Sequence, residues 1–274
     1  MTKQLEKGNR FRELHAEPGI FIIPNPWDVA SAKVLAGLGF PALATSSAAS
    51  AAAIGHKDGG LTREQALAHA RDIVNAVDLP VSADLERGFG DSPEAVAETV
   101  GLAAETGLVG CTIEDETGHP DHPIYDFHHA VERIAAGAEA ARSLPFPFFL
   151  TARAHQLVTA NPGTIDDVIK RLQAFERAGA DVLFAPGLPD LDAVRAVCAA
   201  VAKPVNFMAG IPGKSPSVGE LAAAGVRRVS LATSLYRAAM TALIGTATQV
   251  RDTGDFGFLN CVAATKDIHK LMGI

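Results

Sequence analysis

Short apolar runs alternate along the chain with longer segments in which apolar positions recur at helical spacing. Runs of this length, bounded by Gly, Pro or polar residues, are typical of strands buried on both faces of a parallel sheet. The predicted strands cover residues 20–24, 41–45, 81–84, 110–114, 148–153, 181–185, 204–208 and 227–231.

Helix-start signals follow several of these runs. Thr62 with Gln65, Thr164 with Asp167 and Ser217 with Glu220 predict capping boxes, and Ser92-Pro93 predicts an N-cap with proline in the first turn. Helices are therefore expected over 28–38, from 62, from 92, over 129–142, 164–178 and 191–201, briefly after 217, and over 234–250. The small-residue stretch 46–60 is expected to be a loop.

Eight strand-helix units predict a single α/β domain over 1–274, a (β/α)8 TIM barrel. A doubly wound sheet is the alternative, but it requires a Gly-rich turn after the first strand, where the chain has Pro24-Asn25-Pro26-Trp27. Residues 252–274 exceed what a barrel needs, and a helix is expected over 265–272. This C-terminal extension is expected either to pack on its own barrel or to cover a neighbouring subunit.

Composition and charge limit the possible partners and compartment. The 274 residues carry a formal net charge of −7 and contain no Lys/Arg run, which argues against nucleic acid or an anionic membrane as partner. Cys111, Cys198 and Cys261 are widely spaced and odd in number, so reduced thiols and a cytoplasmic location are expected. No apolar stretch approaches the length of a membrane span, and residues 1–12 do not resemble a signal peptide.

Acidic side chains end two successive predicted strands. Asp84 and Glu86 are two residues apart, so an extended chain directs them to the same side, and Glu114 or Asp115 ends the next strand. Carboxylates this close raise one another's pKa unless a cation lies between them, and Mg²⁺ or Mn²⁺ suits oxygen ligands. Alternatively, these carboxylates cap the following helices or pair with Arg87.

In a (β/α)8 barrel the chemistry lies at the C-terminal ends of the strands. Asn25, Trp27, Ser46, Ser47, Arg153, His155 and Asn206 occupy such positions. Arg153 could bind a substrate carboxylate or phosphonate bidentately, or could be a structural partner of Glu114. Asn206 could bind substrate or satisfy backbone groups.

Several motifs together resemble the phosphoenolpyruvate mutase/isocitrate lyase superfamily from Phe11 to about Ala239. They are Pro24-Asn25-Pro26-Trp27-Asp28, Gly55-His56-Lys57-Asp58, Asp84-Leu85-Glu86-Arg87-Gly88-Phe89-Gly90, Ile113-Glu114-Asp115 and Thr151-Ala152-Arg153. The resemblance implies Mg²⁺ held directly by Asp84, with Asp58, Glu86 and Glu114 acting largely through water. It also implies that Ser46 and Ser47 bind a substrate carboxylate, that the metal and Arg153 stabilise an enolate, and that closed homo-oligomers, usually tetramers, exchange a C-terminal helix.

The loop after the fourth strand departs from the best-known members. Isocitrate and methylisocitrate lyases carry Lys-x-Cys-Gly-His there, and this chain has Thr117-Gly118-His119 without the thiol. The Lys and Asn of the mutase loop are absent too, and Phe184-Ala185-Pro186-Gly187 replaces the mutase histidine after the sixth strand. Because imidazole titrates near neutral pH, His119 is the candidate proton donor, although it could equally be one of several solvent-facing histidines.

The sequence therefore predicts a Mg²⁺-dependent carbon-carbon lyase, similar to 2-methylisocitrate lyase or oxaloacetate decarboxylase. It would act on a small 2-hydroxy or 2-oxo dicarboxylate through a metal-bound enolate, as a homo-oligomer (dimer or tetramer). A phosphonomutase or phosphonate hydrolase, cleaving a C-P bond, is the alternative within enzymes. A non-catalytic metabolite-binding oligomer is the alternative of a different class.

Overall fold

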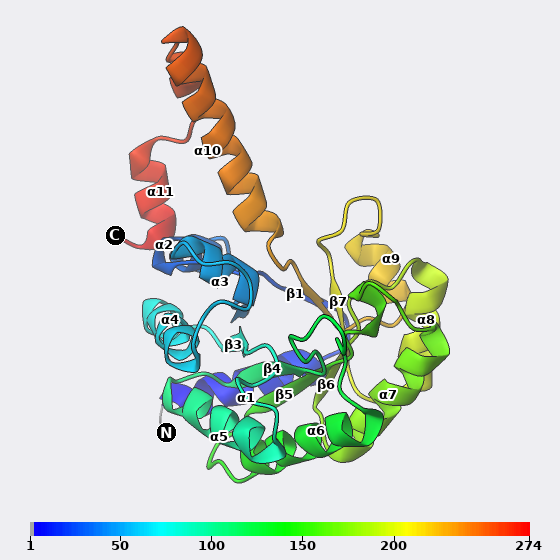
Figure 1. The fold of residues 1–274 in the computed structure, drawn as a ribbon. Coiled ribbons are helices and arrows are strands. Elements are labelled where there is room, and N and C mark those ends of the chain that lie inside the picture. The colour runs from blue at the N-terminus through cyan, green and yellow to red at the C-terminus, as the bar shows by residue number, and fades with distance from the viewer. Residues whose placement is uncertain (1–2) are drawn as a thin grey trace.

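Eight parallel strands form one sheet in the order β1-β8-β7-β6-β5-β4-β3-β2 in the computed structural model, which describes residues 3–274. The two end strands of this order meet where Ala44 N donates to the carbonyl of Pro24 over 3.1 Å, so the sheet curves into a nearly closed barrel (Figure 1). The strands are β1 (Phe21–Ile23), β2 (Leu43–Ala44), β3 (Val81–Asp84), β4 (Gly110–Glu114), β5 (Phe149–Arg153), β6 (Val182–Phe184), β7 (Val205–Met208) and β8 (Arg228–Ser230).

Helices surround the strands and confirm the predicted (β/α)8 barrel. All three predicted capping boxes form, and Ser92 caps a helix with Pro93 in its first turn. The helices are α1 (Lys3–Ala16), α2 (Val29–Gly37), α3 (Ser47–Ala53), α4 (Arg63–Ala76), α5 (Pro93–Glu105), α6 (Phe127–Arg142), α7 (Ile165–Ala178), α8 (Leu191–Ala200), α9 (Val218–Ala223), α10 (Ser234–Thr253) and α11 (Thr265–Met272), with short 3₁₀ turns at Gln156–Val158 and Gly257–Asn260.

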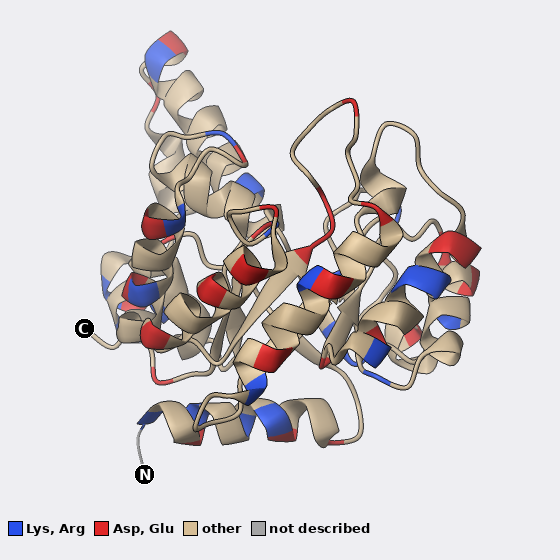
Figure 2. Ribbon diagram, turned by 60° about the horizontal axis from the view of Figure 1, so that its bottom comes forward, with Lys and Arg blue, Asp and Glu red and all other residues tan. Residues whose placement is uncertain are grey.

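The hydrophobic core lies mainly between the strands and the helix ring, where small residues allow close packing. Gly137 of α6 illustrates this, because a Cβ there would lie 3.0 Å from the Val96 side chain of α5. A second cluster closes the opposite end of the barrel from the predicted site, where Phe11 and Leu14 of α1 pack on Ile23 and Val109. In Figure 2, α1 accordingly lies across the bottom of the barrel.

One local expectation from the sequence is wrong. The stretch 46–60, expected to be a loop, begins with the helix α3, whose N-cap is Ser46. The helix expected around 129–142 is confirmed as α6 and begins at Phe127, because the Asp126 side chain accepts hydrogen bonds from the amides of His128 and His129. The helix α1 was not predicted.

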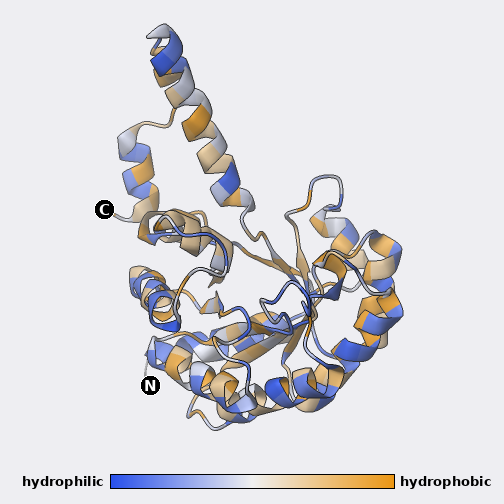
Figure 3. Cartoon of the chain, in the orientation of Figure 1, coloured by the Kyte–Doolittle hydropathy of each residue, from blue (hydrophilic) through white to orange (hydrophobic). Residues whose placement is uncertain are grey.

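The helix expected over 234–250 is present as α10, but it does not pack into the helix ring, which the sequence did not predict. The twenty residues of α10 include none that is buried, and the helix projects away from the barrel (Figure 1). It carries exposed apolar side chains, among them Leu243 and Ile244, in the region where Figure 3 shows apolar colouring on the projecting helix. The predicted helix α11 packs on α2, and a Cβ at Gly37 would lie 2.0 Å from the Leu271 carbonyl oxygen. Cover of a neighbouring subunit stays a prediction.

Among the helices of residues 3–274, none combines the length and the apolar composition that a membrane span requires.

Candidate active site

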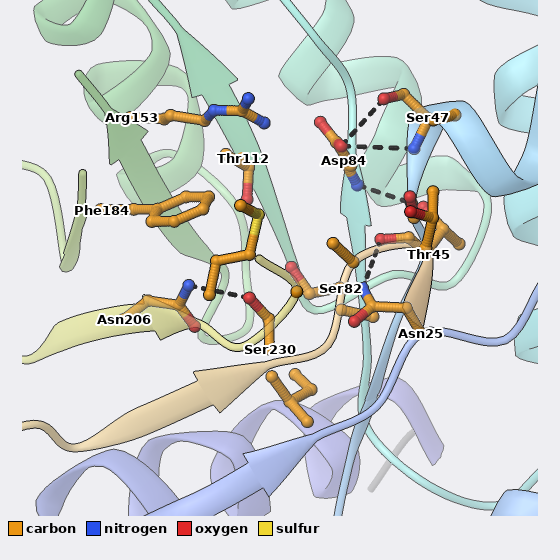
Figure 4. A pocket seen from close by; sticks show the side chains of 18 of the residues that line it. Asn25, Thr45, Ser47, Ser82, Asp84, Thr112, Arg153, Phe184, Asn206 and Ser230 are labelled. Atoms are coloured by element: carbon orange, nitrogen blue, oxygen red, sulfur yellow. Dashed lines mark hydrogen bonds between the residues drawn. The ribbon is translucent and has the colours of Figure 1, made fainter. Parts of the chain in front are cut away.

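A cavity of about 240 Å³ opens inside the barrel and reaches the C-terminal ends of the strands (Figure 4). Asp84, Ser47 and Arg153 lie at its outer part, while Ser82, Thr112 and Arg228 line it deeper within the barrel. An adjoining cavity shares Ser47, Asp58 and Arg153 and is lined further by Lys57, Gly59, Glu86, Arg87, Glu114, Glu116, Gly118 and His155. The structure thus brings the four predicted metal-site carboxylates and Arg153 to one mouth.

Asp84 is held in a fixed orientation at the end of β3. Ser47 donates to Asp84 Oδ2 from both its backbone N, at 3.2 Å, and its Oγ, at 3.0 Å. The amide of Glu86 donates to the other carboxylate oxygen, Oδ1, over 3.3 Å. Burial raises the pKa of Asp84, the nearby Arg153 opposes this, and Glu114 adds to it. The carboxylate is therefore oriented but not neutralised by a direct partner.

Glu86 has a backbone φ of 51°, in the left-handed region that non-glycine residues seldom adopt. Strain of this kind is often found at functional sites. Burial, followed by repulsion from Asp84, Asp58 and Glu114, raises the pKa of Glu86 to about 7. Glu86 therefore lies close enough to the other three predicted metal-site carboxylates to be affected by their charge.

Glu114 ends β4 between two nitrogen-bearing side chains. Its Oε2 lies 2.9 Å from Arg153 Nε and 3.2 Å from His155 Nδ1. Burial alone would raise the pKa of Glu114, but Arg153 and His155 overcome this and lower it to about 2. The structural ion pair considered for Arg153 is therefore present, and the guanidinium also lines both cavities.

The donor set fits a divalent cation. Asp58, Asp84, Glu86 and Glu114 offer hard oxygen atoms, and three of them add to the effect of burial in raising the pKa of Glu86. Glu114, Glu116 and His155 can also each place one donor atom within 4.8 Å of the others. Because clusters of carboxylate oxygens generally suit Mg²⁺ or Mn²⁺, these groups could hold such a metal at this mouth.

The two predicted substrate-binding serines lie at the beginning of α3. Ser46 is the N-cap, and its Oγ accepts a weak hydrogen bond of 3.5 Å from Ala49 N. Ser47 is turned toward Asp84 (Figure 4). Both line the cavity, so each hydroxyl is adjacent to the space a substrate would occupy.

Asn206 is buried on β7 and contacts side chains rather than backbone groups. Its Nδ2 donates to Ser230 Oγ over 3.0 Å, and its Oδ1 accepts from Arg228 Nε over 2.8 Å. Within residues 3–274, the hydrogen bonds of the Asn206 side chain are thus to other side chains, and its amide faces the cavity with Ser230 (Figure 4).

His119 is exposed on the loop after β4 and lines neither cavity. Its backbone amide donates to Thr117 Oγ1 over 2.9 Å, which fixes the loop rather than the imidazole. The catalytic role of His119 stays a prediction.

Asp115, which the sequence offered as the alternative to Glu114, lines neither cavity in the described chain. It faces Arg171, a buried residue that was not predicted, with 3.2 Å between Asp115 Oδ2 and Arg171 Nη1. Burial raises the pKa of Asp115 to about 6 despite this arginine. The strand period contained the signal, because adjacent residues in a strand point to opposite sides and only one of Glu114 and Asp115 could face the mouth.

A (β/α)8 barrel with carboxylates and an arginine gathered at the C-terminal strand ends defines an enzyme with a polar site for an anionic substrate. Comparisons with known proteins then identify the family. The family model for phosphoenolpyruvate phosphomutase matches residues 11–251. The chain belongs to this family, within the phosphoenolpyruvate mutase/isocitrate lyase superfamily, as the sequence motifs predicted.

Similar proteins carry lyase, mutase or hydrolase names. A 2-methylisocitrate lyase of Halalkalibacterium halodurans is 30% identical over 260 residues, which cover 92% of this chain and 84% of that protein. A solved lyase/mutase structure from Burkholderia cenocepacia J2315 has a TM-score of 0.96 at 49% identity, covering 100% of this chain and 98% of the other. Oxaloacetate acetylhydrolase with the inhibitor 3,3-difluorooxaloacetate has a TM-score of 0.86 at 25% identity, covering 99% and 93%. The chain is thus an enzyme of the lyase or mutase type, and the non-catalytic alternative is not supported.

Proposed function

We propose that the protein is a Mg²⁺-dependent carbon-carbon bond lyase that acts on a small 2-hydroxy or 2-oxo dicarboxylate through an enolate. The observation that carries the proposal is the meeting of Asp84, Glu86 and Glu114 with Arg153 at one cavity mouth. The similarity to a 2-methylisocitrate lyase over 92% of the chain supports the same reaction class.

The side chains at the mouth would have different roles according to their charge. Asp84 would hold the metal directly, with Asp58, Glu86 and Glu114 around it, and bound Mg²⁺ would supply positive charge beside the substrate oxygens. Arg153, which stays charged in its carboxylate surroundings, would stabilise the negative oxygen of the enolate as the bond breaks. Ser46 would donate a hydrogen bond from its hydroxyl to the substrate carboxylate, and Ser47 would do the same once the metal replaces it as the partner of Asp84 Oδ2.

A proton must reach the enolate carbon after cleavage. The loop lacks the thiol of the methylisocitrate lyases, and His119 is outside the cavity in this conformation. His119 would serve as donor by a movement of the loop between Glu114 and Asp126 toward the mouth. If His119 does not donate the proton, a water molecule would protonate the enolate carbon.

Turnover assays test the reaction. The purified protein with Mg²⁺ would be offered oxaloacetate, 2-methylisocitrate, 2,3-dimethylmalate and phosphonopyruvate, and the products would be identified by mass spectrometry. Cleavage of one of the first three, abolished by a chelator, is the expected result. Exclusive conversion of phosphonopyruvate would replace the proposal by C-P chemistry, the reaction named in the description of the family model.

A calorimetric titration with oxalate tests the site independently of turnover. Oxalate resembles the planar carboxylate-enolate unit, so its affinity should increase strongly when Mg²⁺ is present. An oxalate affinity that is indifferent to Mg²⁺ would show that the proposed enolate-stabilising site does not exist.

We further propose that the protein is a cytoplasmic homo-oligomer, a dimer or a tetramer, with small carboxylates as its partners. The absence of any buried residue in α10 supports this, because a twenty-residue helix with exposed Leu243 and Ile244 has apolar surface available for a subunit contact. Light scattering should give two or four times the 28.5 kDa mass of the chain, and a monomeric mass would contradict the proposed oligomer.

A further inference from the structure

Below the predicted metal site, the cavity ends at a second buried arginine. Arg228 begins β8, is 4% exposed, and lines the same cavity as Asp84 and Arg153. Barrel interiors are usually filled by branched apolar residues. Here polar side chains share the wall with apolar ones, since Ser82, Thr112 and Ser230 line the cavity together with Ile23 and Ala44.

In the part of the chain that the structure describes, the hydrogen-bond partners of the Arg228 guanidinium are neutral groups. Nε donates to Asn206 Oδ1 over 2.8 Å, one terminal nitrogen donates to Thr151 Oγ1 over 3.0 Å, and the other lies 3.4 Å from His15 Nε2. Within residues 3–274, no carboxylate forms an ion pair with Arg228. Of the five N-H bonds of an arginine side chain, three thus have protein partners in the described chain.

The third partner is a neutral imidazole. Burial, and secondarily Arg228 itself, lowers the pKa of His15 to about 3. An arginine can only donate, so Nε2 of His15 must be the acceptor and Nδ1 carries the proton, which it donates to the Phe11 carbonyl over 2.8 Å. His15 therefore contributes no negative charge and orients Arg228 from below.

Burial lowers the pKa of Arg228 to about 9, so the side chain remains mostly protonated at neutral pH. Burying a cation without a counter-ion costs free energy, and an apolar side chain at this position would fill the barrel without that cost. A negative group that enters the cavity would recover part of this cost. Arg228 therefore has a physical reason to favour an anion at the inner end.

We propose that Arg228 is a positioning and specificity-determining residue that makes the inner end of this cavity select substrates with a second carboxylate. By holding Asn206 Oδ1, it leaves Asn206 Nδ2 and the Ser230 hydroxyl as the polar groups directed at the cavity, and its charge favours the anion that accepts from them. This inference rests on the proposed function, because it assigns the carboxylate remote from the metal.

Two probes separate the inner end from the outer end. Oxalate is short enough to occupy the metal end alone, whereas 3,3-difluorooxaloacetate carries a second carboxylate farther along the molecule. Both would be titrated calorimetrically, with saturating Mg²⁺, into the full-length protein and its variants. Arg227→Met is the matched control, because Arg227 is the adjacent arginine, is exposed, and donates to the Gly19 carbonyl instead.

Arg228→Met should weaken the binding of difluorooxaloacetate roughly 10- to 100-fold, the loss expected for a contact that depends on a charged group. Oxalate affinity should change by less than about twofold, and Arg227→Met should change neither. Equal weakening of both probes, which a merely structural Arg228 would give, would overturn the inference, as would unchanged binding of both.

Asn206→Asp keeps the test valid if Arg228→Met does not fold. An aspartate at 206 would give Arg228 a buried counter-ion, so the thermal midpoint should rise while difluorooxaloacetate affinity falls relative to that of oxalate. Undiminished difluorooxaloacetate binding in this variant would contradict the inference. If oxalate binding by the unmodified protein ignores Mg²⁺, the proposed function fails; if it depends on Mg²⁺ but the two probes respond alike, only the role of Arg228 fails.

Discussion

Arg153 and Arg228 are both buried at one cavity, yet their surroundings are opposite. Arg153 lies among acidic groups, with Glu114 Oε2 at 2.9 Å and Asp84 close enough to raise its pKa. Arg228 has three neutral partners, and burial lowers its pKa to about 9. The protein therefore neutralises the first arginine itself and leaves the second for another negative group to neutralise.

This difference separates chemistry from selection along one cavity. At the mouth, fixed charges of both signs can hold a cation and stabilise an oxyanion that develops during reaction. At the inner end, a single sign of charge with neutral donors can distinguish one substrate from another by its distal group. The following predictions test the comparison, beginning with the largest effect.

Replacing Asp84 should cause the largest loss. Asp84→Ala removes the oriented carboxylate at the centre of the predicted metal site, so kcat in the Mg²⁺-dependent reaction should fall by about 10³-fold or more. Steady-state kinetics on the substrate found in the turnover assay would measure it, with circular dichroism to confirm the fold. Asp192→Ala, at an exposed residue of α8, is the control and should retain full activity. Unchanged turnover in Asp84→Ala would place the site elsewhere.

Removing each arginine should affect stability differently. In metal-free protein near pH 7, Arg153→Met leaves Glu114 buried without its cation and should lower the free energy of unfolding by about 3 kcal/mol or more. In this variant the pKa of Glu114 in the folded state would rise above its pKa in the unfolded state. The loss of unfolding free energy should therefore be present at pH values above the unfolded-state pKa and should become smaller as the pH falls below it. Chemical denaturation at pH 4 and pH 7 would measure both values.

Arg228→Met is the counterpart in the same experiment. It leaves neutral acceptors, so its stability loss should be smaller and should not recover at low pH through a carboxylate. If the loss of unfolding free energy depended on pH in the same way in both variants, the two arginines would not differ in how the protein neutralises their charge.

Much of this site could be predicted from strand ends alone. Asp84, Glu86, Glu114 and Arg153 follow short apolar runs, and parallel strands bring such ends to the same edge. The period of two does not account for Glu86, because β3 ends at Asp84 and Glu86 has a left-handed backbone conformation. The structure confirms that these residues gather at one mouth, while their roles stay predictions.

Arg228 could not be assigned in the same way. The pair Arg227-Arg228 places one side chain inside and one outside, and the sequence alone does not say which. The register that pairs Arg228 with both Phe21 and Asn206 decides it. Long-range partners such as His15, far away in the chain, are set by packing and carry no local signal.

The helix α3 was missed for a related reason. Ser47–Ala53 contains only Ala and Ser, so no apolar stripe distinguishes a helix from a small-residue loop. For α10, the reverse holds: its helical pattern was clear, but its lack of buried residues could be seen only in three dimensions.

The metal-free mouth should weaken the fold as the pH rises. Glu86 has a pKa of about 7 in the folded chain, above the ordinary value near 4.5, so the folded state holds the proton more tightly than the unfolded state. Stability from this group is full below the unfolded value and is lost as the pH rises toward 7, by about 1–2 kcal/mol after screening by solvent. Denaturation in a chelator from pH 5 to pH 8 would measure this slope.

Glu86→Gln should flatten that slope, whereas Glu105→Gln, at an exposed residue of α5, should leave it unchanged. Adding Mg²⁺ should stabilise the unmodified protein more at pH 8 than at pH 5, because protons and the cation compete for the same carboxylates. Equal stabilisation at both values would argue against carboxylate ligation of the metal.

The smallest effect concerns a single hydroxyl beneath the cavity. Thr112 and Thr151 are register partners on β4 and β5, but only the Thr151 hydroxyl accepts a hydrogen bond from Arg228 in the described chain. Thr151→Val should therefore cost about 1 kcal/mol of unfolding free energy, and it should loosen Arg228 enough to weaken difluorooxaloacetate binding slightly. Thr112→Val is the matched control for stability, since it makes the same chemical change one strand away at a residue that forms no hydrogen bond with the guanidinium in the described chain. If both variants lose equal stability, the neutral cradle of Arg228 contributes nothing specific, and the contrast between the two arginines depends on Arg153 alone.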